Sequence, residues 1–141
     1  MALFDMFKGA APLEITPRRA LVISLIYCMG ADGEIDPEEV GHLISVLGRN
    51  ATREELDRCF KHARNTPAEK FLQEAVPKLN DAQRLCILLN MIDSAMADGE
   101  AEPGERDLIV RFQQAFGFDD SKLEPYFRTL VAKNERSILD R

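Results

Sequence analysis

The sequence contains no tryptophan, only two histidines and only three cysteines among its 141 residues. The cysteines are Cys28, Cys59 and Cys86, and none of them has the CxxC or Cys/His spacing of a thiolate zinc site. Cys28 and Cys86 lie inside apolar runs, so we expect buried, reduced thiols there. Few cysteines without a short spacing are typical of a cytoplasmic protein that has no disulfide framework.

Positive charge and long apolar runs are also scarce. The chain has 18 Lys and Arg against 24 Asp and Glu, which gives a net charge of −6. Nucleic-acid binding requires an excess of cations that neutralise phosphates, so we expect no nucleic-acid partner. Residues 20–29 are nearly all apolar, but a membrane span needs roughly 20 such residues. The N-terminus also lacks the pattern of a signal peptide, and we expect no stable membrane insertion.

Catalytic motifs are missing as well. His42 and His62 have no serine, cysteine or acidic partner at a recognisable spacing, and we expect His42 to be exposed. The chain contains no GxSxG, no HExxH and no glycine-rich phosphate loop. Without a nucleophile or a general base in a known arrangement, we expect that the protein is not an enzyme.

The sequence does contain many helix signals, and it has the composition of one globular domain spanning residues 1–141. Capping residues, several followed by Pro or by Glu or Gln, start helices at Thr16, Asp36, Thr52, Thr66, Asn80 and Ser121. Apolar residues then recur at helical spacing, which predicts helices over 17–30, 38–48, 53–64, 67–79, 82–97, 104–116 and 122–133. We therefore predict an all-α fold, a compact bundle of about seven helices. Two of them, 17–30 and 82–97, are apolar nearly all round and should lie in the middle, covered on every side.

An internal repeat organises these helices. RRALVISLIYCMGADG, which starts at Arg18, matches RLCILLNMIDSAMADG, which starts at Arg84, with a constant offset of 66 residues. This predicts a short N-terminal segment (1–15), a first three-helix unit (16–64), a connecting helix (67–79) and a second unit (81–134). Short connections make successive helices antiparallel, so the two central helices should run parallel, with both following loops at the same end.

These two loops are strongly acidic. DGEIDPEE at residues 32–39 and DGEAEPGE at residues 98–105 together hold nine of the 24 carboxylates. Hard cations prefer oxygen ligands, so the loops are candidate cation sites. The usual twelve-residue calcium loop does not fit, because placing Gly33 at its turn position puts Cys28 and Gly30 where ligands are required.

Helix capping explains some of these carboxylates. Asp36 is predicted to cap a helix, while Glu39 and Glu105 occupy the third position of a capping box. Four other carboxylates are not needed for capping and are either cation ligands or solvated surface groups: Asp32, Glu34, Asp98 and Glu100.

The apolar helix that ends in Ala-Asp-Gly-Glu, followed by Ile-Asp-Pro-Glu-Glu and by a second Ala-Asp-Gly-Glu 66 residues later, resembles the TerB-like (tellurite resistance) domain over residues 16–135. The resemblance implies an all-helical bacterial protein connected with tellurite resistance and stress response. Related domains occur at the N-terminus of some membrane-anchored J-domain co-chaperones. The second loop departs from the fuller pattern, because Ala101, Glu102 and Gly104 replace Ile, Asp and Glu.

The resemblance also implies a divalent metal site (calcium, magnesium, manganese or zinc) at the acidic motif. The residues to which this role carries over are Asp32, Glu34, Asp98 and Glu100, with Glu39 and Glu105 as outer members. We therefore expect a non-enzymatic stress-response module that binds a divalent cation and docks on a partner protein. The alternative is a metal-free scaffold or co-chaperone-type domain whose acidic surface binds a basic partner.

Two further segments have open interpretations. Cationic residues gather around the helix at 53–64, as either a solvated face or a docking face for an acidic partner: Arg49, Arg53, Arg58, Lys61, His62 and Arg64. The N-terminal MALFDMFKG either packs on the domain as a short helix or engages a membrane surface or a partner.

Overall fold

A computed structural model describes residues 12–30, 36–97 and 103–140. In these ranges the chain forms seven α-helices, two 3-10 helices and no strand, which confirms the all-α prediction. The α-helices are α2 (Pro17–Gly30), α3 (Pro37–Leu47), α4 (Arg53–Asn65), α5 (Ala68–Ala75), α6 (Asp81–Ala97), α7 (Pro103–Phe116) and α8 (Asp120–Asn134), and the 3-10 helices are η1 (Val76–Lys78) and η2 (Arg136–Asp140). The predicted segment 1–15 is described only from residue 12, and within that part Ile15 is buried.

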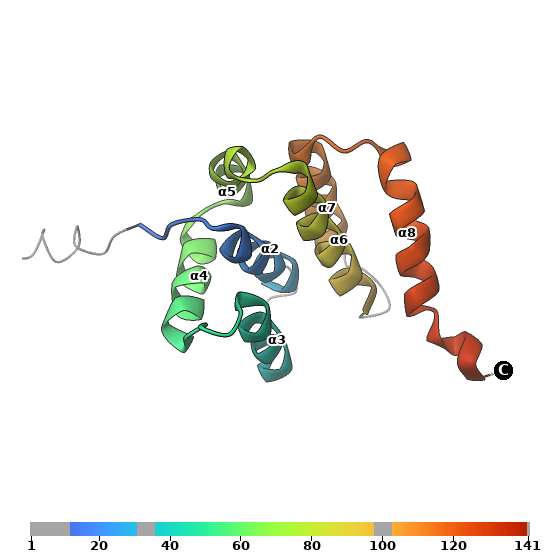
Figure 1. Cartoon of the computed structure of the whole chain (residues 1–141), viewed down its shortest axis with the longest axis horizontal. Helices are drawn as coiled ribbons and strands as arrows, with labels where there is room; N and C mark the ends of the chain where they lie inside the picture. Colours follow the sequence, from blue (N-terminus) through green and yellow to red (C-terminus); the bar gives the residue numbers. More distant parts are fainter. Residues whose placement is uncertain (1–11, 31–35, 98–102, 141) are drawn as a thin grey trace, which may run out of the picture.

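The helices form two groups of three (Figure 1). Helices α2, α3 and α4 lie on one side, α6, α7 and α8 on the other, and α5 connects them. Helix α2 packs against α3, α4, α6 and α7, while α6 packs against α2, α7 and α8. This is the arrangement expected of two three-helix units, although the duplication itself remains a prediction.

Four of the predicted caps form as the sequence indicates. The side-chain oxygens of Thr16, Asp36, Thr52 and Asn80 each accept a hydrogen bond from the amide three residues later. Asn80 also forms a complete capping box, because its own amide donates to the Gln83 side chain at 2.9 Å. Local sequence therefore fixes where these helices begin.

Two predicted caps are wrong. No side chain caps α5, which begins after Pro67, and the Thr66 carbonyl instead accepts a hydrogen bond from the Tyr27 hydroxyl. Helix α8 is capped by Asp119 rather than Ser121, because the Asp119 carboxylate accepts the Lys122 amide at 2.8 Å. This earlier start leaves Pro125 inside α8.

Burial confirms the prediction that the helix at 17–30 is covered on every side. It corrects the same prediction for the helix at 82–97. In α2 the run from Val22 to Ile26 is buried without a break, so the helix is covered on every side. In α6, by contrast, Cys86 is exposed, which corrects the expectation of a buried thiol at that position. The physical reason is that α6 is covered by α2, α7 and α8 but leaves one face of its first half open.

A line of aromatic rings joins the two groups of helices. Phe71 of α5 lies 5.6 Å from Tyr27 of α2 and 6.2 Å from Phe112 of α7, measured between ring centroids. Phe112 in turn meets Phe116 edge-to-face at 5.7 Å. Such pairs stabilise a core beyond the area that they bury. Helix α5 therefore links the two groups of helices through the ring contacts of Phe71.

Candidate functional site

The described flanks of the acidic loops meet at one end of the molecule. A hollow of about 380 Å³ is lined by Met29 of α2, by the first turns of α3 and by the last turns of α6. Its polar lining comprises Asp36, Glu38, Glu39, His42, Asn90, Asp93 and Ser94. The last turns of α2 and α6 therefore lie beside each other, as expected if both central helices run parallel and their loops follow at the same end.

The acidic residues at the start of α3 have different structural roles in this hollow. The Asp36 carboxylate accepts the Glu39 amide at 2.9 Å, so the capping role predicted for it is confirmed. Glu38 is exposed in the first helical turn, where the helix dipole favours a negative charge. Glu39 is half-buried and lines the hollow, and the exposure expected for His42 is also found.

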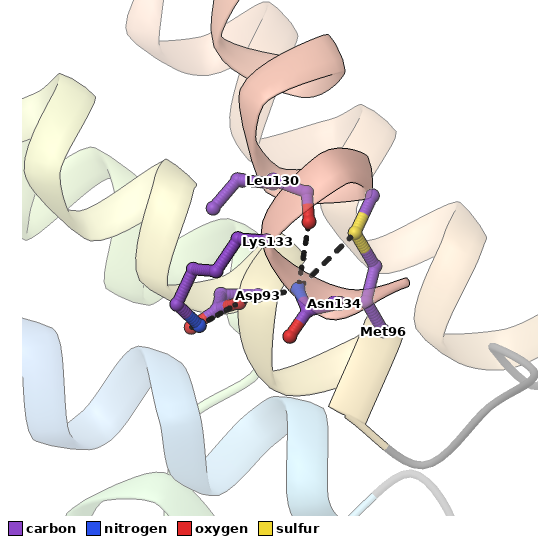
Figure 2. Close-up of polar contacts among 5 residues, drawn as sticks. All are labelled: Asp93, Met96, Leu130, Lys133 and Asn134. Carbon is purple, nitrogen blue, oxygen red and sulfur yellow. Dashed lines mark hydrogen bonds and ion pairs between the residues drawn. The ribbon is translucent and has the colours of Figure 1, made fainter. Parts of the chain in front are cut away.

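Asp93 is a member of the hollow that the sequence analysis missed. Lys133 of α8 reaches its two carboxylate oxygens at 3.1 and 3.2 Å, and the Asn134 amide donates to it at 2.8 Å (Figure 2). The Asn134 hydrogen bond and the Lys133 contacts hold the pKa of Asp93 below its ordinary value, against the opposing effect of partial burial. The two residues of each contact are about 40 positions apart in the sequence, so no short-range sequence pattern predicts the contact.

Glu105 is buried in the first turn of α7. It is 4% exposed, and its charge is one cause that raises the pKa of Cys28, after burial of the thiol, to about 12. Glu105 lies in the first turn of α7 in the second group, whereas Cys28 lies in the last turn of α2 in the first. The capping-box Glu of the second unit therefore lies near the central helix of the first unit.

The other capping-box Glu makes the reciprocal approach. Glu39 of α3 lines the same hollow as Ser94 of α6, and Ser94 is the residue that corresponds to Cys28 at the offset of 66. Glu39 therefore shares a hollow with α6, and Glu105 lies near Cys28 of α2, so each is close to the central helix of the opposite unit in a crossed arrangement.

The predicted ligands fall into two groups in the structure. Asp32, Glu34, Asp98 and Glu100 lie outside the described residues, while Glu39 and Glu105 are placed as above. Among the described residues, no group of three or more His, Cys, Asp or Glu side chains is close enough to hold a metal ion. The described residues therefore do not form a metal site by themselves.

The buried thiols do not contribute reactive groups. Burial raises the pKa of Cys28 to about 12 and that of Cys59 to about 11, with the charges of Glu105 and Glu55 as secondary causes. A thiol acts as a nucleophile or metal ligand only as the thiolate. Both thiols are therefore protonated near neutral pH, and the polar groups that line the described hollow are carboxylates, the Ser94 hydroxyl, the Asn90 amide and the His42 imidazole.

The basic face around α4 is partly used by internal contacts. Arg53 pairs with Asp57 one turn later, with 3.5 Å between their charged atoms. His62 is mostly buried, and its Nε2 lies 3.9 Å from the Glu74 carboxylate of α5. These contacts fit a solvated, internally paired helix face, which was one of the two interpretations of this cluster.

The sequence matches the family model described as tellurite resistance protein TerB over residues 18–126. This match covers most of the chain, and the protein therefore belongs to the TerB family, as its paired acidic motif indicated. No curated protein and no solved structure matches the chain. None of the helices in the described ranges has the length and apolar character that crossing a membrane requires.

Proposed function

We propose that this TerB-family protein is a non-enzymatic, cytoplasmic stress-response module of a bacterial cell that binds a divalent cation between its two acidic loops. The observation that supports the proposal most directly is the crossed arrangement of the loop flanks. Glu39 lines a hollow shared with α6, and Glu105 lies near Cys28 of α2, so a described residue that follows each loop is close to the opposite central helix. A cation between them would draw carboxylates from both units.

The donor chemistry at this end suits a hard cation. The described acidic side chains supply oxygens, and the nearest cysteine, Cys28, is held as a neutral thiol. Calcium, magnesium and manganese prefer such oxygen donors, whereas zinc favours nitrogen and thiolate ligands. In the proposal Asp32, Glu34, Asp98 and Glu100 bind the ion, and Glu39 and Glu105 act as outer members.

A bound cation would also change the charge of the surface to which other proteins bind. Carboxylates that cluster without a cation repel one another and attract basic partners. A bound cation neutralises part of this charge, so partner docking at this end becomes dependent on the metal. We propose a protein partner that recognises the cation-loaded loops.

A second candidate function follows from the Asp93 contacts. Lys133 already pairs with the Asp93 carboxylate at the hollow, and this internal contact supports the alternative. A metal-free scaffold or co-chaperone-type domain would use the same acidic surface for lysine or arginine side chains of a partner. This alternative predicts binding that weakens with salt and does not need a divalent cation.

Backbone NMR of the full chain, titrated separately with calcium, magnesium, manganese and zinc, tests the proposal. We expect shifts confined to residues 32–39 and 98–105 and to the hollow around Ser94. Paramagnetic manganese should broaden the same amides most strongly. The double variant Asp32→Asn with Asp98→Asn should abolish these changes.

Asp57→Asn is the matched control, because Asp57 is an exposed carboxylate on α4 that pairs only loosely with Arg53. It should leave the titration unchanged. If no amide near the loops responds to any of the four cations, the metal proposal is wrong and the metal-free alternative takes its place. If the responses persist in the double variant, the assignment of the ligands is wrong.

A further inference from the structure

An apolar groove lies on the second group of helices, away from the acidic hollow. It has a volume of about 660 Å³, with a floor of Ile92, Ala95 and Met96 from α6. One wall is the α7 stripe of Arg106, Ile109, Val110 and Gln113, and the other is the α8 stripe of Asp120, Leu123, Glu124 and Phe127. Each stripe has the spacing of one helix face, so the groove runs along both helices.

Several large apolar side chains in or beside this groove are unusually open to solvent. Phe127 is 49% exposed and Val110 is 47% exposed. Val131, 43% exposed, continues the α8 stripe one turn beyond Phe127. Apolar patches of this kind, bordered by charged residues, mark interaction surfaces in soluble proteins.

The corresponding region of the first unit is closed. Helix α4 packs against both α2 and α3, and its Leu56 and Cys59 are fully buried. Phe60 is partly buried against the core, and it matches Phe127 if the repeat is one residue longer here, as Leu56 then matches Leu123. In the second unit α8 packs mainly against α6, so the groove between α7 and α8 remains open.

The two walls of the groove carry opposite charges. Arg106 lies on the α7 wall, near the start of that helix, while Asp120 and Glu124 lie on the α8 wall, near the start of α8. One oxygen of each carboxylate already has a partner, because Asp120 accepts a hydrogen bond from the Gln113 amide at 2.7 Å and Glu124 pairs with Arg128 at 2.6 Å. Within the described part of the chain, Arg106 makes no hydrogen bond or ion pair. Helices α7 and α8 are joined by a short connection and run in roughly opposite directions (Figure 1).

We propose that this groove binds a second copy of the chain, with α8 of each copy lying antiparallel to α8 of the other. A helix antiparallel to α8 runs in the same direction as α7. Its acidic first turns, with Asp120 and Glu124, then lie beside Arg106 at the start of α7. The same contact forms twice, because a two-fold interface uses one surface patch on both copies.

The exposed apolar side chains of α8 are also consistent with the antiparallel pairing of the two α8 helices. Phe127 and Val131 of each copy enter the groove of the other, where Val110 and the α6 floor surround them. The resulting contact has an apolar centre and a charged rim, which is the usual anatomy of a protein interface. The contact uses described residues of α6, α7 and α8, none of which is a proposed metal ligand, so we expect the dimer to form without added cation.

Sedimentation velocity of the full chain across a concentration series, in buffer with a metal chelator, tests the proposal. We expect a monomer–dimer equilibrium that Phe127→Asp weakens about tenfold or more, because this change places a charge at the centre of the contact. Leu139→Asp is the matched control. It makes the same kind of change at a side chain that is 80% exposed and does not line the groove, and it should sediment like the parent protein.

A charge exchange tests the orientation of the two copies. Arg106→Glu and Glu124→Arg should each weaken the dimer, and the double variant should restore it, because the pair is rebuilt across the two-fold axis. Arg111→Glu controls for charge on α7, since Arg111 does not line the groove. A monomer at every concentration, a dimer that survives Phe127→Asp, or a double variant as weak as the single ones would overturn the proposal.

Discussion

Asn134 of α8 donates a hydrogen bond from its side-chain amide to the Asp93 carboxylate of α6 at 2.8 Å, and this contact fastens the last turn of α8 to the central helix. The same Asn134 amide also donates to the Leu130 carbonyl one turn earlier in α8. Together with Lys133, it fixes a carboxylate at the edge of the acidic hollow. The end of α8 is thus held by polar contacts rather than by apolar burial.

The Asp93 contacts predict a pH dependence of stability. The pKa of Asp93 is lowered in the folded state, so its stabilising contribution is present above the unfolded pKa of about 3.9 and is lost as the pH falls through the folded value. Asp93→Asn should therefore cost about 1 kcal/mol at neutral pH, a figure reduced for partial exposure, and much less under acidic conditions.

Urea unfolding of the parent protein and of Asp93→Asn between neutral and acidic pH measures this difference. Asp57→Asn is the control, because Asp57 is well exposed and its ion pair with Arg53 should contribute little at any pH. A stability difference between the parent and Asp93→Asn that stays constant with pH would contradict the assignment.

Thiol reactivity should separate the three cysteines. Cys86 is exposed, whereas Cys28 and Cys59 are buried with pKa values raised to about 12 and about 11. Because only an accessible thiolate is alkylated quickly, iodoacetamide at mildly alkaline pH should modify Cys86 first. Peptide mass spectrometry after timed quenching identifies the modified site, and in urea all three thiols should react. Native labelling of Cys28 at the rate of Cys86 would be inconsistent with the burial of α2.

The aromatic contact between the two groups of helices predicts a large effect of Phe71→Ala. Phe71 is 1% exposed and meets both Tyr27 and Phe112, so removing its ring leaves a cavity at the junction. The expected loss of unfolding free energy is about 3–5 kcal/mol. Leu139→Ala, at an exposed position of η2, should change it by less than about 0.5 kcal/mol. Chemical unfolding of both variants makes the comparison, and similar values for the two would show that Phe71 does not join the units.

Two positions with similar sequence signals should behave differently as helix caps. Asn80→Ala removes an acceptor that the Gln83 amide uses at 2.8 Å, and it should cost about 1 kcal/mol. Thr66→Ala removes a side chain that caps no helix, and it should cost less than about 0.5 kcal/mol. Thermal unfolding of the two variants distinguishes them, and the reverse order would mean that α5 is capped as its sequence suggests.

The sequence was sufficient for the all-α class, for the family and for most helix boundaries. Capping oxygens and periodic apolar residues act over three or four positions, so they can be read along the chain, as Asn80 with Gln83 shows. The two failures, at Thr66 and Ser121, arose because a neighbouring residue takes the N-cap position, Pro67 in α5 and Asp119 in α8. The sequence also singled out Glu39 and Glu105 by local spacing, and their capping-box role stays a prediction.

Only the tertiary structure decided which of these residues meet. The packing of the helices places Glu105 near Cys28 and Glu39 beside the hollow shared with Ser94. It also brings Asp93 into contact with Lys133 and Asn134. The packing also determines that Cys86 is exposed in an apolar helix and that a groove lies beside Phe127. The physical reason is that local hydrogen bonds and helical periodicity depend on neighbours in the chain. Burial, long-range ion pairs and open apolar surfaces depend on how whole helices pack, which the spacing of residues does not specify.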